Sequence, residues 1–406
     1  MDIKFIDGGV CAPQGFKANG IHCGIRKNKD KKDIALIVSE KIASTAAVYT
    51  QNLVYGAPIT VTRNNIADGK AQAMVCNSGI ANTCNADGIE KAEAMCECVA
   101  KNTQIKKEDV IVASTGVIGQ PLDIEPIEKG MPELVKGLNV NGSDDAANSI
   151  MTTDTQKKEF AVEVEIDGKK CKIGAIAKGS GMIHPNMATM LCFITTDVAI
   201  SSDMLKKALT LTVADSFNML SVDGDTSTND MVSIMANGLA GNSEINKEGK
   251  DFDLFVEALK AIAIKTVRLM AKDGEGATKL VECSVEGAKD EQTAKVLAKS
   301  VICSSLVKAA MFGSDANWGR VLCALGYAKV QLDVTKVDVA FVSKAGRIEV
   351  CKNGAGIEFS EDLAKKILLE DEILIDVKLQ DGQAKATAFG CDLTYDYVKI
   401  NGDYRT

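Results

Sequence analysis

The chain has 406 residues, a formal net charge of −8, and a composition that is 46% hydrophobic and 25% charged. These proportions are typical of a globular protein, and the length is sufficient for two domains or one elaborate domain. The acidic balance argues against nucleic acid as a partner, because the only basic run, residues 26–32, is short and interrupted.

The amino-terminal residues lack the apolar region of a signal peptide, and no apolar stretch approaches the length of a membrane span. We therefore expect a cytoplasmic protein with no membrane partner. Thirteen cysteines are scattered without any C-x-x-C pair, and the two nearest, Cys96 and Cys98, diverge on an expected helix. Because His22 and His184 are the only histidines, zinc also lacks histidine ligands, and we expect free thiols and no metal.

The first half of the chain alternates apolar strands with helices. Buried strands are predicted for the apolar runs at residues 33–38, 73–76 and 110–113. Residues 88–99 have helical spacing, with Asp87 as a candidate N-cap. Residues 160–166 and 169–177 flank the turn Asp167-Gly168 and predict a β-hairpin.

The hairpin leads directly into Lys178 and a glycine-rich segment that ends at Ala188-Thr189. A strand to residue 198 and a helix from Ser202 are expected next, followed by amphipathic helices at 252–272 and 291–311. A second hairpin, 337–342 with 347–350, indicates a smaller C-terminal lobe. These patterns predict an α+β protein with sheets packed between helical layers.

The pair Ala188-Thr189 stands between small residues with a proline and an apolar run, which suits a hydroxyl in a tight loop before a buried strand. Such a threonine can attack the preceding carbonyl, break the chain, and emerge with a free amino group. That amine, with a reference pKa of about 7.7–8.0, can serve as the base for the hydroxyl. The scarcity of histidine favours this kind of catalyst, although an isolated Ala-Thr pair is ordinarily only a loop.

Residues 178–197 as a whole resemble the cleavage site of the ornithine acetyltransferases, also called bifunctional glutamate N-acetyltransferases. Further motifs of that family follow in the expected order, so the resemblance extends from about residue 12 to 406. It implies a layered sandwich of mixed sheets flanked by helices, of the self-cleaving N-terminal-nucleophile type, with a smaller C-terminal lobe. It also implies cleavage between Ala188 and Thr189 into fragments 1–188 and 189–406.

Two motifs before the cleavage site carry further candidate residues. Residues 112–119 form a Ser-Thr-Gly turn after a buried strand, and the resemblance makes Thr115 and Gly116 the oxyanion hole, through a hydroxyl and a backbone N–H. In residues 151–155 it makes Thr153 a substrate contact in preference to Thr152, where an ordinary turn is the alternative. Lys178 is implied as a substrate ligand.

Two motifs in the second half would ordinarily be solvent-exposed. Glu275, flanked by glycines, has the pattern of a turn residue, and residues 397–406 that of a frayed tail. The resemblance instead implies that Glu275 pairs with the ammonium of ornithine. It also implies that the tail folds into the pocket, with Asn401 and Thr406 touching substrate.

Three segments and the residue His184 are left without a settled role. The acidic segment 223–230 fails as a calcium loop, because the sixth position from Asp223 is Thr228 and the twelfth is Ile234. The motif around Trp318 favours packing or a subunit contact. Neither His184 nor the asparagine-rich turn at 76–83 is assigned a role.

The function implied by the resemblance is acetyl transfer from N2-acetylornithine to glutamate through an acetyl-Thr189 intermediate, in arginine biosynthesis. No cofactor is implied, and the sequence does not decide whether acetyl-CoA is also a donor. The family implies a heterotetramer of two copies of each fragment. Two alternatives stay open: an N-terminal-nucleophile aminopeptidase or amidase, which would pass the acyl group to water, and a binding protein that never cleaves and would run as one 43.1 kDa band.

Overall fold

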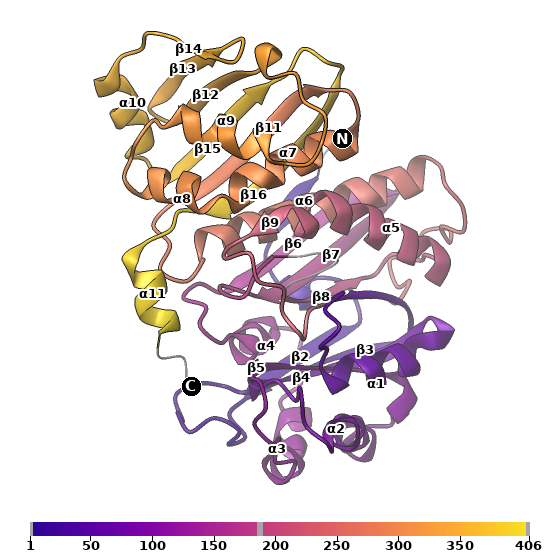
Figure 1. Ribbon diagram of the computed structural model, residues 1–406. Helices are drawn as coiled ribbons and strands as arrows, with labels where there is room; N and C mark the ends of the chain where they lie inside the picture. Colours follow the sequence, from indigo (N-terminus) through magenta and orange to yellow (C-terminus); the bar gives the residue numbers. More distant parts are fainter. Residues whose placement is uncertain (1–2, 185–189, 403–406) are drawn as a thin grey trace.

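The computed structural model describes residues 3–184 and 190–402. Within these residues the chain forms two mixed β-sheets with helices packed against their faces (Figure 1). This arrangement confirms the α+β class and the layered mixed sheets flanked by helices that were predicted from the sequence.

The first sheet contains nine of the described strands, in the order β1-β6-β7-β8-β10-β3-β4-β5, with β2 paired to β3. They are β1 (Lys4–Ile6), β2 (Phe16–Ile21), β3 (Ile34–Tyr49), β4 (Lys70–Ile80), β5 (Val110–Val117), β6 (Lys158–Ile166), β7 (Lys169–Lys178), β8 (Leu191–Thr196) and β10 (Met231–Ala236). The pairs β8–β10 and β4–β5 are parallel. The predicted strands are present, but β3 is far longer than residues 33–38. It continues past a register shift between Val38 and Ala43 to pair with β10, so one strand serves two parts of the sheet.

The second sheet has seven described strands and is smaller than the first, as predicted, but it contains more strands than the one hairpin predicted from the sequence. Its described strands run in the order β14 (Ala355–Gly356), β13 (Gly346–Lys352), β12 (Asp338–Ser343), β15 (Glu372–Lys378), β11 (Leu280–Ala288), β16 (Ala384–Cys391) and β9 (Leu220–Ser221). The predicted hairpin is β12–β13. The parallel strands β11 and β15 are far apart in sequence, which is why hairpin signals alone did not find them.

The described helices cover both sheets (Figure 1). They are α1 (Ala57–Asn65), α2 (Gly88–Asn102), α3 (Glu125–Lys136), α4 (Ser143–Ile150), α5 (Ser202–Asp215), α6 (Lys250–Lys272), α7 (Glu291–Cys303), α8 (Ser305–Phe312), α9 (Trp318–Gly326), α10 (Glu361–Leu368) and α11 (Tyr395–Asn401). The prediction of one helix over 291–311 is wrong. The chain breaks at Ser304, whose hydroxyl accepts the N–H of Val307 and starts α8. Asp87 precedes α2 as predicted but makes no capping hydrogen bond.

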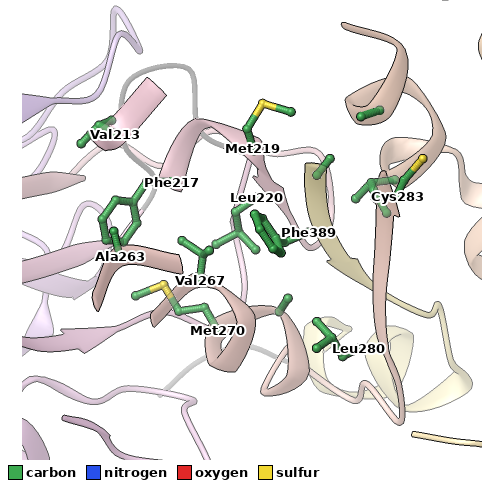
Figure 2. Close-up of a cluster of buried hydrophobic side chains, with 14 of the residues drawn as sticks. Val213, Phe217, Met219, Leu220, Ala263, Val267, Met270, Leu280, Cys283 and Phe389 are labelled. Atoms are coloured by element: carbon green, nitrogen blue, oxygen red, sulfur yellow. The ribbon is translucent and has the colours of Figure 1, made fainter. Parts of the chain in front are cut away.

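Helix α6 joins the two sheets through the main hydrophobic core. Figure 2 shows Val267 of α6 beside Leu220 of β9 and Phe389 of β16, all three fully or almost fully buried. Burial of this apolar surface anchors the carboxyl end of α6. The turn that follows α6, which carries Glu275, therefore has a fixed position.

The predicted hairpin β6–β7 brings Lys178 to the region of the turn that carries Glu275. Asp167 and Gly168 have φ angles of 51° and 68°, the positive values of a type I′ turn, and the strands pair without a register shift from Ile166 opposite Lys169 to Lys158 opposite Ala177. No helix of the described ranges is long and apolar enough to cross a membrane. All thirteen cysteines lie in those ranges and are free; most are buried, whereas Cys84 and Cys323 are exposed.

Candidate functional site

A pocket of about 110 Å³ lies where the ends of β5 and β7 approach the turn after α6 and the helix α11. It is lined by Ala81, Thr115, Gly116, Ile118, Thr152, Thr153, Lys178, Gly181, Met182, Ser227, Thr228, Asn229, Glu275 and Asn401. Six predicted site residues are among them: Thr115, Gly116, Thr153, Lys178, Glu275 and Asn401. The remaining ones, Ala188, Thr189 and Thr406, lie outside the described residues.

The pair Thr115-Gly116 ends β5 against the parallel strand β4, where Gly116 is opposite Gly79. Gly116 has a φ of 133°, and a Cβ there would lie 2.2 Å from the carbonyl carbon of Gly79. Only glycine fits this backbone, so the turn can bring a main-chain N–H close to a ligand. Thr115 is almost completely buried and adds a hydroxyl to the pocket.

Thr153 is held by the glycine-rich loop that follows Lys178. Its hydroxyl is 2.7 Å from the hydroxyl of Ser180, and the carbonyl of Ser180 accepts the N–H of Glu275 at 2.9 Å. Thr152 also lines the pocket, so position alone does not separate the two threonines. Ser180 thus connects three segments that are distant in sequence.

A buried ion cluster fixes these segments. The ammonium of Lys158, whose side chain is 0% exposed, lies 2.7 Å from Asp154 and 2.5 Å from Asp273. Asp154 also accepts the N–H of Gly179, directly after Lys178. Burial opposes ionisation of Asp154, but the charges of Lys158 and Lys178 outweigh it and lower its pKa to about 2.

Glu275 is not the solvent-facing turn residue that its glycine neighbours would suggest. The residue is only 8% exposed, and its Oε2 accepts a hydrogen bond of 2.8 Å from the amide of Asn401. A Cβ on Gly181 would lie 2.2 Å from the carboxylate, so the glycine leaves room for it. Helix α11 therefore lies against the pocket, at the left edge of Figure 1 between the two sheets.

The acidic segment 223–230, which fails as a calcium loop, holds the glycine-rich loop. Asp223 accepts the N–H groups of Met182 and Ile183 at 2.6 and 2.8 Å. Met182 has a φ of 54°, which such anchoring helps to maintain. In the part of the chain that is described, no group of three or more His, Cys, Asp or Glu side chains is placed to hold a metal.

Asp230 lines a small recess next to the main pocket, together with Thr115 and Lys178. It is 2% exposed, and its Oδ2 has no hydrogen-bond partner among the described residues. Burial raises the pKa of its carboxyl well above the ordinary value. A carboxyl group of this kind is costly in a core and is typical of functional sites.

His184 lies beside Ser221 and Cys303. Its Nδ1 lies 3.1 Å from the Ser221 hydroxyl and 3.5 Å from the Cys303 sulfur. Burial, with a smaller effect of the Lys299 charge, lowers the His184 pKa to about 4. Trp318 begins α9 and packs over Gly356 of β14.

The sequence analysis missed Asp154, Ser180, Asn229 and Asp230. Asp154 and Ser180 each lie within two residues of a predicted site residue, and that proximity was the available signal. Asn229 and Asp230 were considered only as calcium ligands. The side chain of Asn229 contacts segments more than a hundred residues away, which the local sequence pattern does not reveal.

The pocket combines an ammonium group, a carboxylate, several hydroxyls and a backbone turn at a glycine. Its volume is well below the roughly 300–1,000 Å³ of sites for drug-sized ligands, so it suits a small charged molecule such as an amino acid.

Comparison with known proteins identifies the family of this chain. Residues 17–406 match the ArgJ family. The arginine biosynthesis bifunctional protein ArgJ 1 of Clostridium acetobutylicum is 52% identical over 392 residues, which cover 96% of each chain. ArgJ of Bacillus subtilis is 46% identical over 403 residues, covering 99% of this chain and 97% of the relative.

Among solved structures, the arginine biosynthesis bifunctional protein argJ of Bacillus halodurans is 44% identical with a TM-score of 0.50. The match covers 52% of this chain and 97% of that one. The family match and the identities over nearly the whole length confirm the resemblance that the motifs indicated. The chain therefore belongs to the ArgJ family, the family of acetyltransferase enzymes that its sequence resembles.

Proposed function

We propose that this protein transfers the acetyl group of N2-acetylornithine to glutamate, giving ornithine and N-acetylglutamate for arginine biosynthesis. The observation that carries the proposal is that six residues expected from separate motifs line one small pocket. The relatives named as arginine biosynthesis bifunctional proteins support the same pathway.

Maturation is the first step of the proposal. The hydroxyl of Thr189 attacks the carbonyl of Ala188, the acyl group passes from the nitrogen to the oxygen of Thr189, and the amino group of Thr189 is freed. Water then hydrolyses the resulting ester, which restores the hydroxyl and separates fragments 1–188 and 189–406. The Bacillus halodurans match supports a division of this kind, because 97% of that solved chain corresponds to only 52% of this one.

In the transfer step, the Thr189 hydroxyl attacks the acetyl carbon of acetylornithine, and the new amino group takes its proton. The tetrahedral intermediate carries a negative oxygen, for which Thr115 provides a hydroxyl and Gly116 a backbone N–H. Its collapse breaks the C–N bond, and the departing amine of ornithine takes the proton. The amine of glutamate then attacks the acetyl ester, which releases the hydroxyl and forms N-acetylglutamate.

Substrate recognition uses the charged groups of the pocket. Lys178 pairs with the substrate carboxylate, and Glu275 with the side-chain ammonium that ornithine carries and glutamate lacks. Thr153, Asn401 and Thr406 contribute polar contacts. The proposal includes no cofactor, allows acetyl-CoA as a second donor, and extends to a cytoplasmic heterotetramer of two copies of each fragment.

An acceptor experiment tests the proposal. The purified protein is incubated with N2-acetylornithine, with and without glutamate, and ornithine and N-acetylglutamate are measured. We expect stoichiometric formation of both products only when glutamate is present. Release of ornithine with free acetate at the same rate without glutamate would identify a hydrolase, and no release at all would support a binding protein.

A further inference from the structure

Asn229 lies at the point where three distant segments meet at the pocket. It precedes β10 and is 8% exposed. Its side-chain nitrogen donates to the carbonyl of Ala81 at 2.6 Å and to that of Ser114 at 3.0 Å. Its side-chain oxygen accepts from the hydroxyls of Thr83 and Thr228, both at 2.6 Å.

These four contacts use the full capacity of the amide, which has two donor hydrogens and two acceptor positions. The orientation of the amide is also determined. Carbonyl oxygens only accept, so the nitrogen must face Ala81 and Ser114 and the oxygen must face the two hydroxyls. A fully satisfied buried amide of this kind restricts every group that it contacts.

The contact with Ser114 bears directly on the expected oxyanion hole. The Ser114 carbonyl belongs to the peptide group that links Ser114 to Thr115, and a planar peptide moves as a unit. Fixing that oxygen therefore fixes the N–H of Thr115 and the start of the Thr115-Gly116 turn. The contact with Ala81 fixes the end of β4, where Gly79 pairs with Gly116.

Asn229 also connects this turn to the strand pair that follows the cleavage site. β10 pairs in parallel with β8, and the N–H of Met231 donates to the carbonyl of Met190 at 2.9 Å. A displacement of Asn229 would thus change the distance between β5 and the start of β8.

We propose that Asn229 is a positioning residue that holds the Thr115-Gly116 turn in register with the β8–β10 strand pair, so that acyl transfer depends on its amide. The inference rests on the proposed function for its kinetic part. Asn229 acts through Thr115 and Gly116 and needs no contact with the substrate.

The chain offers a matched control. Asn237 follows the other end of β10, is 4% exposed, and donates from its amide to the carbonyl of Gln14 at 2.8 Å, away from the pocket. Asn229→Asp and Asn237→Asp both replace a buried amide donor by an acceptor facing a carbonyl. They impose a similar burial cost at the two ends of one strand.

The experiment measures kcat and KM on cleaved preparations. Asn229→Asp should lower kcat about 10²-fold with little change in KM, as expected for a small misplacement of catalytic groups, whereas Asn237→Asp should not. Thr115→Ala should lower kcat about 10²–10³-fold. Because both changes act through one turn, the double variant should be only a few-fold slower than Thr115→Ala. The proposal would be overturned if the loss of kcat in the double variant equalled the product of the two single losses. An unchanged kcat in Asn229→Asp would also overturn it.

Should Asn229→Asp not fold, Thr83 provides a milder test. Thr83→Val removes one hydroxyl donor to Asn229 at nearly constant shape, and Thr83→Ser keeps it. We expect a lower kcat in Thr83→Val and recovery in Thr83→Ser; equal rates in both would contradict the proposal.

Hydrogen exchange separates this inference from the proposed reaction. Amides of β5 should exchange faster in Asn229→Asp than in Asn237→Asp, whatever the substrate. If the wild type transfers no acetyl but exchange increases in this way, the reaction is wrong and the positioning role stands. Unchanged exchange with active wild type would refute the positioning role alone.

Discussion

At the scale of single residues, Glu275 is a buried carboxylate whose Oε2 accepts a hydrogen bond from the side-chain amide of Asn401. Glu275→Gln keeps the size of the side chain but removes the charge that would face a substrate ammonium. A hydrogen bond to a charged group contributes roughly 1.5–3 kcal/mol, so we expect kcat/KM for N2-acetylornithine to fall about 10- to 100-fold.

The comparison of two donors makes this prediction specific. A neutral acetylated amino acid has no side-chain ammonium, so its kcat/KM should fall less in Glu275→Gln. Equal losses for both donors would mean that Glu275 has only a structural role.

His184 should make folding sensitive to acid. Its pKa is lowered from 6.5 to about 4 by burial and the charge of Lys299, with a small opposing effect of Asp225. Between these two pH values the unfolded chain binds a proton at His184 that the folded protein does not, so stability falls as the pH decreases through that window. We expect His184→Gln to lose less stability than wild type from pH 7 to pH 4 in urea unfolding. Parallel stability curves would show that His184 does not titrate in this way.

At the scale of elements, the buried cluster around Lys158 ties the start of β6 to the end of α6. Lys158→Met would leave Asp154 and Asp273 buried without their cation, and we expect a loss of about 3–5 kcal/mol in unfolding free energy. Lys207→Met, which removes an exposed pair with Glu248, should cost at most about 1 kcal/mol. Similar losses in the two variants would show that the cluster is not structurally important.

Elements defined by local chemistry were predictable, and those defined by distant contacts were not. The hairpin around Asp167-Gly168 needs only a turn and two alternating strands, so the sequence specifies it completely. The break between α7 and α8 was missed because the apolar spacing continues across Ser304, and a single capping serine does not interrupt it. The register shift in β3 and the second sheet depend on pairing between segments far apart in the chain.

The residues of the site also divide into those that the sequence predicts and those that only distant contacts reveal. Thr115, Lys178 and Glu275 were expected because they belong to motifs with a recognisable order, and the structure brings them to one pocket. Their supporting residues, such as Asn229 and Lys158, have no local signature. Their positions follow from tertiary hydrogen bonds that only the folded chain defines.

At the scale of the whole molecule, the two expected fragments contribute strands to one sheet. β8 and β10 lie between β7 and β3, so strands from after residue 189 are hydrogen-bonded on both sides to strands from before it. Scaling 43.1 kDa by the 188 and 218 residues of the fragments gives about 20 and 23 kDa. We expect two such bands on a denaturing gel but one species under native conditions.

Thr189→Ala removes the hydroxyl and should leave the chain intact on the same gel. Normal cleavage of that variant would refute the role of Thr189 in maturation. Fragments that separate without denaturant would contradict the shared sheet.

The most direct test of the proposed reaction is the mass of the protein after brief incubation with N2-acetylornithine and no acceptor. We expect the fragment that begins at residue 189 to gain one acetyl group, located on Thr189, and to lose it when glutamate is added, with N-acetylglutamate appearing in equal amount. An unmodified fragment in a preparation that still turns over, or an acetyl group on another residue, would contradict the acetyl-threonine mechanism.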